Sequence, residues 1–135
     1  MNLVEALIKA DAKKAEELKT SVFLSKRLGK ILGQSEAVEV KIKELPHRRV
    51  NDILAYQVDK RGEYDFSKSF DAKLMMIVEG VVEPDLKNKE LQEHFGCGKA
   101  RELAEKLFQS EVTELSDAIA DISEVGEGSE EEIKN

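Results

Sequence analysis

The amino-acid sequence predicts an α+β fold that is predominantly α-helical, with about five helices and a small antiparallel β-hairpin in the N-terminal third. Two patterns carry this prediction. Over most of the chain, apolar residues recur every three or four positions, as they do on the buried face of an α-helix. Residues 38–43, VEVKIK, instead alternate apolar and charged residues, which is typical of a half-buried strand.

The composition fits a single small domain rich in helix. The chain has 135 residues, of which 41% are hydrophobic and 36% are charged, and it lacks tryptophan. A chain of this length can bury one substantial core. We therefore assign residues 1–125 to one domain. Residues 126–135, GEGSEEEIKN, have no apolar periodicity and carry a run of glutamates, which predicts a disordered acidic tail.

The sequence does not predict a membrane or secreted protein. No run approaches the roughly 20 apolar residues that a membrane-spanning helix needs. Glu5 interrupts the short apolar stretch at the N-terminus, which disfavours a signal peptide. The single cysteine, Cys97, excludes an internal disulfide. These features predict a cytoplasmic protein without a membrane partner.

Residues 3–19 predict an amphipathic helix at the N-terminus. Its apolar face begins with Leu3, Val4, Leu7 and Ile8, and lysines and glutamates occupy the positions between the apolar ones. Such a helix either packs on the body of the protein or serves as an arm that binds a partner. We expect it to pack.

The clear strand at residues 38–43 has a candidate partner upstream. Apolar and polar residues alternate around Val22 and Leu24, and two glycines, Gly29 and Gly33, lie in the long connection. A two-stranded hairpin is marginally stable by itself, so it must lie on a helix or pair with another edge. An exposed edge is also able to accept a strand from another subunit, and both arrangements remain open.

The densest apolar stretch, residues 70–95, predicts two helices joined by a tight corner. The buried face of the first helix is expected at Phe70, Leu74, Ile77, Val78 and Val81. This helix should end near Val81, because glycine is a weak helix former and Pro84 disfavours helical geometry at the residue before it. Asp85 and Asn88 are candidate caps for the second helix, which Gly96 ends. The residues of the structural corner are Gly80, Pro84, Asp85 and Leu86.

Three further helices are predicted from the same spacing. One starts at Pro46, a residue favoured in the first helical turn, and runs to about residue 59. A turn at residues 60–63 follows, and Asp65 or Ser67 caps the central helix. The last two helices cover residues 99–109 and the segment from Ser110, its predicted cap, to Ile122.

The titratable residues do not form a catalytic or metal-binding pattern. His94 and Cys97 have the spacing of half a zinc site, but the sequence has no second half, and His47 lies far away. Acidic residues crowd the corner, among them Glu79 and Asp85. Helix capping and the favourable interaction of acids with a helix N-terminus explain these acidic residues more simply than acid–base catalysis does. We therefore predict a protein without enzymatic activity, cofactor or metal.

Charge is unevenly distributed along the chain. Residues 1–50 carry 11 lysines and arginines against 7 acids, a net charge of +4, and residues 51–135 carry 10 against 21, a net charge of −11. This polarity permits head-to-tail contact between copies. The basic residues gather between Lys26 and Arg49, which gives an alternative interpretation: a small cytoplasmic nucleic-acid-binding or regulatory protein. The overall acidity, and the lack of aromatic residues other than Phe23 in this region, disfavour nucleic-acid binding.

The central stretch also carries a resemblance to a known family. The segments EGVVEPDL at residues 79–86, KEL at 89–91, FG at 95–96 and ELAEKLF at 102–108 resemble the conserved centre of the XkdN-like phage tail assembly chaperones. The resemblance extends from the region of Val22 to Ile122. One position departs from the pattern, since such sequences often carry a proline where this one has Ala100.

The resemblance implies a chaperone for the assembly of a long phage or prophage tail in the cytoplasm of a bacterial host. Such a protein would bind the tape measure protein, keep it soluble until the tail tube polymerises around it, and be absent from the finished virion. The implied partners are the tape measure protein and, at displacement, the tail tube protein; self-association remains open. No nucleotide, metal or nucleic acid is implied.

The last two predicted helices supply more apolar surface than one helix face can bury. Leu103, Leu107 and Phe108 cannot all point to one side of a single helix. We therefore expect some of this surface to stay free for the client, chiefly at Leu107, Phe108, Leu115 and Ile119. The alternative is that all of it is buried within the monomer.

Deleting the residues after Val125 is expected to leave the melting temperature unchanged, because Ile133 is the one large apolar residue among them. Thermal unfolding of the truncated and full-length chains tests this expectation. A large fall in the melting temperature would show that the tail docks, with the basic region between Lys41 and Arg49 as the expected site.

Overall fold

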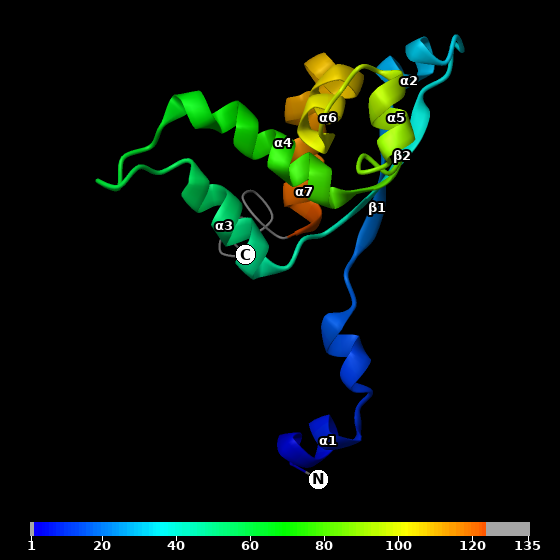
Figure 1. Ribbon diagram of the computed structural model, residues 1–135. Helices are drawn as coiled ribbons and strands as arrows, with labels where there is room; N and C mark the ends of the chain where they lie inside the picture. Colours follow the sequence, from blue (N-terminus) through cyan, green and yellow to red (C-terminus); the bar gives the residue numbers. More distant parts are fainter. Residues whose placement is uncertain (1, 124–135) are drawn as a thin grey trace, which may run out of the picture.

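The computed structural model describes residues 2–123 and shows an α+β fold dominated by helices (Figure 1), which confirms the predicted fold class. The strands are β1 (Thr20–Ser25), β2 (Val38–Lys43) and β3 (Val81–Glu83). The α-helices are α1 (Leu3–Lys9), α2 (Lys26–Ile31), α3 (His47–Tyr56), α4 (Ser69–Gly80), α5 (Lys89–His94), α6 (Ala100–Phe108) and α7 (Val112–Ile122). Short 3-10 helices are η1 (Ala12–Glu16), η2 (Phe66–Lys68) and η3 (Gln109–Glu111). The predicted acidic tail lies outside the described residues.

The three strands form one antiparallel sheet in the order β1-β2-β3. The predicted pairing of β1 with β2 is confirmed, with a register that runs from Thr20 opposite Lys43 to Ser25 opposite Val38. β3 was not predicted, because its three residues are too few to display an alternating pattern. It pairs with β2 and so supplies the extra edge that an isolated hairpin lacks. Among the described strands, β1 and β3 form the two edges of the sheet.

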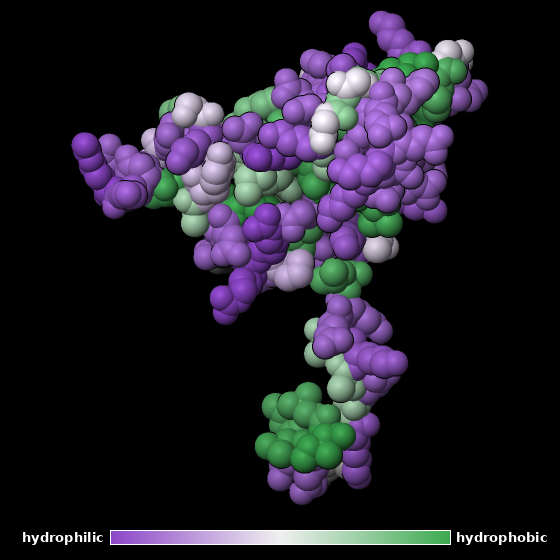
Figure 2. Space-filling model, viewed as in Figure 1, coloured by the Kyte–Doolittle hydropathy of each residue, from purple (hydrophilic) through white to green (hydrophobic). Residues whose placement is uncertain are grey.

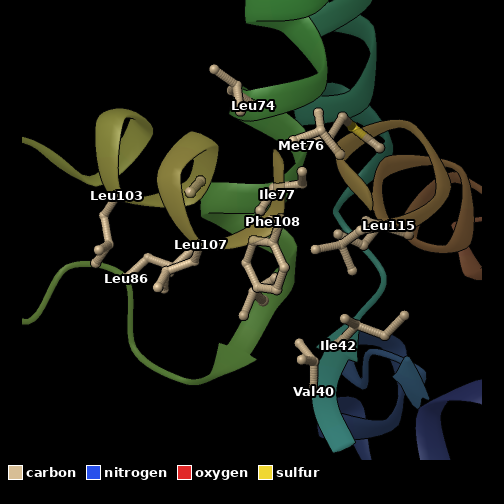
Figure 3. Packing of buried hydrophobic residues seen from close by; sticks show 14 of the residues in the cluster. Val40, Ile42, Leu74, Met76, Ile77, Leu86, Leu103, Leu107, Phe108 and Leu115 are labelled. Atoms are coloured by element: carbon tan, nitrogen blue, oxygen red, sulfur yellow. The ribbon is translucent and has the colours of Figure 1, made fainter. Parts of the chain in front are cut away.

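The core lies between the inner face of the sheet and helices α4, α6 and α7. Phe108 is fully buried, and its ring lies among side chains from three other elements: Ile77, Leu115, Val40 and Ile42 point toward the same interior (Figure 3). Ridges of apolar side chains on α4 pack against α7 and α6. Within residues 2–123, the structure contains no helix long and apolar enough to cross a membrane.

The predicted corner combines a helix end with a close approach between helices. α4 ends at Gly80, as the sequence predicts, and a Cβ atom there would lie 2.7 Å from two carbons of the Ile119 side chain on α7. Leu86 is buried, and its carbonyl oxygen accepts a hydrogen bond from Nε2 of Gln92 at 2.8 Å. The predicted cap is confirmed at Asn88, whose Oδ1 accepts the backbone N–H of Leu91 at 2.9 Å. The corner is therefore held by packing at one end and by hydrogen bonds at the other.

A polar clamp joins α2 to the junction between α6 and α7. The carboxylate of Glu111 accepts the hydroxyl of Ser25 at 2.6 Å and the backbone N–H of Lys26 at 3.0 Å, and so satisfies donors at the start of α2. In the other direction, Arg27 donates from Nε to the carbonyl oxygen of Leu107 at 3.1 Å. Each element thus satisfies backbone groups that the other leaves unpaired at its end.

The N-terminal segment differs from the prediction. Residues 3–19 do not form one helix, because α1 ends at Lys9 and a separate 3-10 helix, η1, follows. The expectation that this segment packs on the body is wrong: every described residue before Lys19 is exposed. Figure 1 shows the segment extending away from the rest of the molecule.

The prediction from the sequence missed one other feature and misplaced another. The long connection between β1 and β2 contains α2, and Gly29 lets α2 approach the loop that leads into β2, since a Cβ there would lie 2.2 Å from the carbonyl oxygen of Glu36. The predicted cap at Ser110 is wrong, because residues 109–111 form a 3-10 turn and α7 begins only at Val112. Gln109 adopts a positive φ of 40° at this turn.

Replacing Gly80 with valine is expected to destabilise the fold by more than about 1 kcal/mol, because overpacking against Ile119 forces α4 and α7 apart. Gly80→Ala should also lower the melting temperature, although alanine favours helix by about 1 kcal/mol over glycine. Gly98→Ala is the control, since the nearest atom to a Cβ at that position is 3.8 Å away. A Gly80→Ala variant that melts at a higher temperature would mean that the helices adjust without cost.

Replacing Phe108 with aspartate is expected to unfold the chain. Removal of a buried phenylalanine side chain costs about 3–5 kcal/mol, and an unpaired buried carboxylate adds several more, which together approach the whole stability of a small domain. Circular dichroism and thermal melts measure the result. Phe66→Asp serves as the matched control, because Phe66 is 84% exposed and should tolerate the same change. A folded Phe108→Asp protein would contradict this account of the core.

Candidate partner-binding surfaces

The four residues predicted to contact a client, Leu107, Phe108, Leu115 and Ile119, are all buried in the folded chain. The expectation that part of this surface stays free is therefore wrong, and the alternative, burial within the monomer, describes the structure. α6 has neighbours on several sides, because α4, α7 and α2 all pack against it. For this reason Phe108 is enclosed even though it does not share one helix face with Leu103. Use of these side chains by a partner would require α6 and α7 to leave the core.

The titratable residues near the corner serve separate structural contacts. Glu79 forms an ion pair with Arg49, and Glu83 lies 3.4 Å from the ammonium group of Lys41, so the two carboxylates do not share a site. Oδ1 of Asp85 accepts the backbone N–H of Lys87. Among residues 2–123, no group of three or more His, Cys, Asp or Glu residues has a metal-binding arrangement. These acids therefore make structural contacts at the corner and the sheet edge, where the exposed Lys41–Glu83 pair adds little stability.

The predicted histidine–cysteine pair also has a structural environment. Cys97 is buried, and its Sγ lies 3.6 Å from the carbonyl oxygen of Phe95. The ring of His94 packs edge-to-face against Phe95 at 5.1 Å between centroids. Within the described residues, neither side chain belongs to a group of three or more His, Cys, Asp or Glu residues arranged to hold a metal ion.

The basic region between Lys26 and Arg49 does not present one uninterrupted cationic face. Arg27 binds backbone carbonyls of α6, Lys41 pairs with Glu83, and Arg49 pairs with Glu79. Phe23, the aromatic residue of this region, is partly buried against the core and does not offer a stacking platform. The geometry therefore gives no support to nucleic-acid binding.

The first exposed apolar surface is the N-terminal arm, which we define as residues 2–18. Its helix α1 is capped by Asn2, whose Oδ1 accepts the backbone N–H of Glu5 at 2.9 Å. The large apolar side chains of α1 are 65–77% exposed: Leu3, Val4, Leu7 and Ile8. Figure 2 shows them as one hydrophobic cluster that stands apart from the body. The arm is fixed at its base by two hydrogen bonds of 2.8 Å between Lys19 and Glu44.

The second surface is the α2–α5 groove, a largely apolar hollow of about 230 Å³ beside the end of the sheet. It is lined by Leu28, Ile31, Leu32, Val38, Glu39, Glu83, Pro84, Leu91, Phe95 and Leu107. Leu32 stands at its rim and is 65% exposed. Leu107, one of the predicted contact residues, contributes to its lining although its side chain is almost completely buried. The groove therefore presents an apolar lining that is open to solvent at Leu32.

The third surface is the aromatic tip, which we define as Tyr64, Phe66 and Phe70 at the start of α4. All three side chains are exposed, and the rings of Tyr64 and Phe66 meet edge-to-face at 4.9 Å. Asp65, between them, caps η2 by accepting the backbone N–H of Ser67 at 2.9 Å and its hydroxyl at 2.6 Å. The tip is thus a local structure with its aromatic rings turned to solvent.

The hydrogen bonds at Asp65 also lower the pKa of its carboxyl group. The hydroxyl of Ser67, and then its backbone N–H, hold the pKa of Asp65 below its ordinary value of 3.8. Because this pKa is lowered in the folded state, the cap is fully formed above pH 3.8 and is lost as the pH falls through the folded-state pKa. The tip is therefore intact at neutral pH.

Sequence reasoning found only part of these surfaces. The amphipathic pattern of α1 was visible, but the pattern does not distinguish an arm from a packed helix. The turn at residues 60–63 was predicted, yet the exposure of Tyr64 and Phe66 depends on the packing of the neighbouring helices. The groove combines α2 with α5, and α2 had no predicted counterpart. Two aromatic residues beside a predicted turn, Tyr64 and Phe66, were the one available sequence signal for the tip.

Comparisons with known proteins identify the family. The family model for the phage XkdN-like tail assembly chaperone protein matches residues 4–135, which is nearly the whole chain. No curated protein matches it. Among solved structures, the crystal structure of the protein YqbN, a structural genomics target, has a TM-score of 0.59 and 16% sequence identity. That similarity covers 87% of this chain and 98% of YqbN, and at this identity it supports the fold alone. The family match decides the assignment: the chain belongs to the phage XkdN-like tail assembly chaperone proteins.

Proposed function

We propose that this chaperone binds the tape measure protein of a phage tail in the bacterial cytoplasm and keeps it soluble until the tail tube protein polymerises around it. The chaperone is then displaced and is absent from the finished virion. Membership of the tail assembly chaperone family supports the general role. The observation that supports a client-binding site most strongly is the exposure of the aromatic tip, where Phe66 is 84% exposed.

A large aromatic ring in water is costly unless a partner covers it. Aromatic residues carry much of the binding energy at protein interfaces, because they bury a large area and lose few side-chain rotations. Phe66 is also held in place, since the Asp65 cap fixes its backbone and Tyr64 packs against its ring. A client helix that presents apolar residues at three- and four-residue spacing is able to cover such a tip.

The size of the tip suits reversible binding. Complete burial of a phenylalanine side chain contributes about 1.5–3 kcal/mol, so a contact centred on Phe66 is weak by itself. Many copies along one long client bind far more tightly together than each does alone. The tail tube protein then needs to displace only one weak contact at a time. This combination fits a chaperone that has to leave as the tube grows.

Replacing Phe66 with aspartate is expected to abolish the solubilising effect without unfolding the chaperone. The tape measure protein would be co-expressed with each variant, and its soluble and insoluble fractions would be measured after lysis. Because the Phe66 side chain is 84% exposed, the melting temperature of the variant should stay close to that of the wild type. The matched control is Leu24→Asp, at a position on the outer face of the sheet that is 61% exposed.

Two outcomes would contradict the proposal at different levels. A wild-type chaperone that leaves the tape measure protein insoluble would overturn the proposed function. A Phe66→Asp chaperone that solubilises its client as well as the wild type would remove the aromatic tip from the binding site. Equal losses for Phe66→Asp and Leu24→Asp would also refute a specific role for the tip.

A further inference from the structure

We propose that a hollow between α3 and α4 binds a short helical segment of a partner protein, one that carries carboxylates at one end and apolar side chains at the other. We call this hollow the α3–α4 cleft. Its volume is about 420 Å³, and it is lined by Arg49, Tyr56, Met75, Val78, Glu79, Lys87 and Arg101. The inference goes beyond the proposed function, because it concerns a surface other than the aromatic tip and defines its ligand by chemistry alone.

The cleft has a charged end and an apolar end. Figure 1 shows α3 and α4 lying side by side. Arg49, in the first turn of α3, forms an ion pair with Glu79, near the end of α4, so both residues lie at the charged end. Tyr56 is the last residue of α3, and Nζ of Lys68, just before α4, lies 5.3 Å from the centroid of its ring. The two ends are therefore two helical turns apart along α3, a distance of about 10 Å.

Apolar side chains form the wall that leads away from the charged end. Met75 and Val78 lie one turn apart on α4 and are partly buried against the core, so each has one side packed and another side turned to the cleft. The ring of Tyr56 continues this wall at the far end. Apolar side chains of a ligand would remove this wall from water.

The charged end contains two cations without a partner in the part of the chain that the structure describes. The side chains of Lys87 and Arg101 form no ion pair or hydrogen bond with residues 2–123. Arg101 is half-buried and lies in the first turn of α6, where the helix dipole disfavours a positive charge. A half-buried charge gains from a partner of opposite sign. The position of Arg101 thus has a cost that the carboxylate of a ligand would offset.

The balance of charges selects an acidic ligand. Three cations and one carboxylate line the cleft, a net charge of +2, whereas the whole chain has a net charge of −7. The carboxylate, Glu79, is already paired with Arg49. Complementary charge contributes mainly to the choice and orientation of a partner, and the apolar wall contributes the affinity.

The lining favours a protein segment over a nucleic acid. Tyr56 is the one aromatic residue among those that line the cleft, and Lys68 already occupies a face of its ring, so the ring is not free to stack on a base. The acidity of the whole chain opposes a phosphate backbone. A helix of two to three turns, by contrast, presents side chains at the spacing of the two ends of the cleft.

A synthetic peptide tests the cleft with the full-length chain and without any other tail protein. The peptide has about 15 residues, long enough to become helical on binding. Glutamates stand at one end of a helix face, and leucines stand two turns away on the same face. One control peptide carries lysines in place of the glutamates, and another carries serines in place of the leucines. Fluorescence anisotropy of the labelled peptides measures binding, and we expect the acidic peptide to bind at least about tenfold more tightly than either control.

Matched variants separate the cleft from the overall charge of the protein. Lys87→Gln with Arg101→Gln removes the two unpaired cations, and Lys60→Gln with Arg61→Gln removes the same charges from the exposed turn at residues 60–63. Both double variants should keep the wild-type melting temperature. We expect the first to bind the acidic peptide about tenfold more weakly and the second to bind it like the wild type. If Arg101→Gln lowers the melting temperature, Lys87→Gln is measured alone.

Several results would overturn the proposal. Equal losses for the two double variants would refute the cleft as the site, as would tight binding of the lysine peptide or a wild-type chain that does not bind the acidic peptide. Displacement of the bound peptide by duplex DNA would assign the cleft to a phosphate backbone instead.

The acidic tail of the chain is the competing occupant. A chain without residues 126–135 that binds the peptide about tenfold more tightly than the full-length chain, with Lys87 and Arg101 required for the gain, would identify the tail as the ligand and refute an external partner. Unchanged affinity would support the external partner. Each of these results is independent of whether the tape measure protein is the client.

Discussion

Ile119 on α7 packs into the space that Gly80 leaves on α4, at a distance that no side chain at position 80 would permit. The rest of the structure depends on this approach. α4 is the central helix, and it contacts α3, α6, α7 and β3. Its end at Gly80 leads directly into β3, so the position of α7 also determines where the third strand meets β2. Packed interiors tolerate little change in volume. The lack of a side chain at Gly80 therefore determines how closely the helical layer and the sheet meet at this junction.

Much of this fold could be predicted from local patterns, and the misses have a common cause. The alternation in residues 38–43 identified β2, and the spacing of Leu74 and Ile77 identified the buried face of α4. These signals lie within one element. α2 escaped prediction because it has only six residues and because its start, although capped by Ser25, is also held by Glu111, a residue more than 80 positions away in the sequence. Phe108 was placed at the surface for a similar reason: periodicity describes one buried face, whereas α6 is enclosed by several neighbours.

The candidate surfaces were harder to predict than the core. An exposed apolar residue and a buried one look the same in a sequence, and only the packing of other elements separates them. Leu7 and Leu107 both occupy regular positions on amphipathic helices, yet the first is in solvent and the second is in the core. The arm, the groove and the tip occupy separate parts of the fold.

The clamp between Arg27 and α6 has a consequence for the groove beside it. Arg27 belongs to α2, one wall of the groove, and it binds the carbonyl oxygen of Leu107, whose side chain contributes to the lining. Glu111 holds the start of the same short helix. The wall is thus tied to the core in the folded chain, and the conformational entropy of ordering it is lost during folding. A site that is rigid in advance lets a small apolar contact be used almost entirely for affinity.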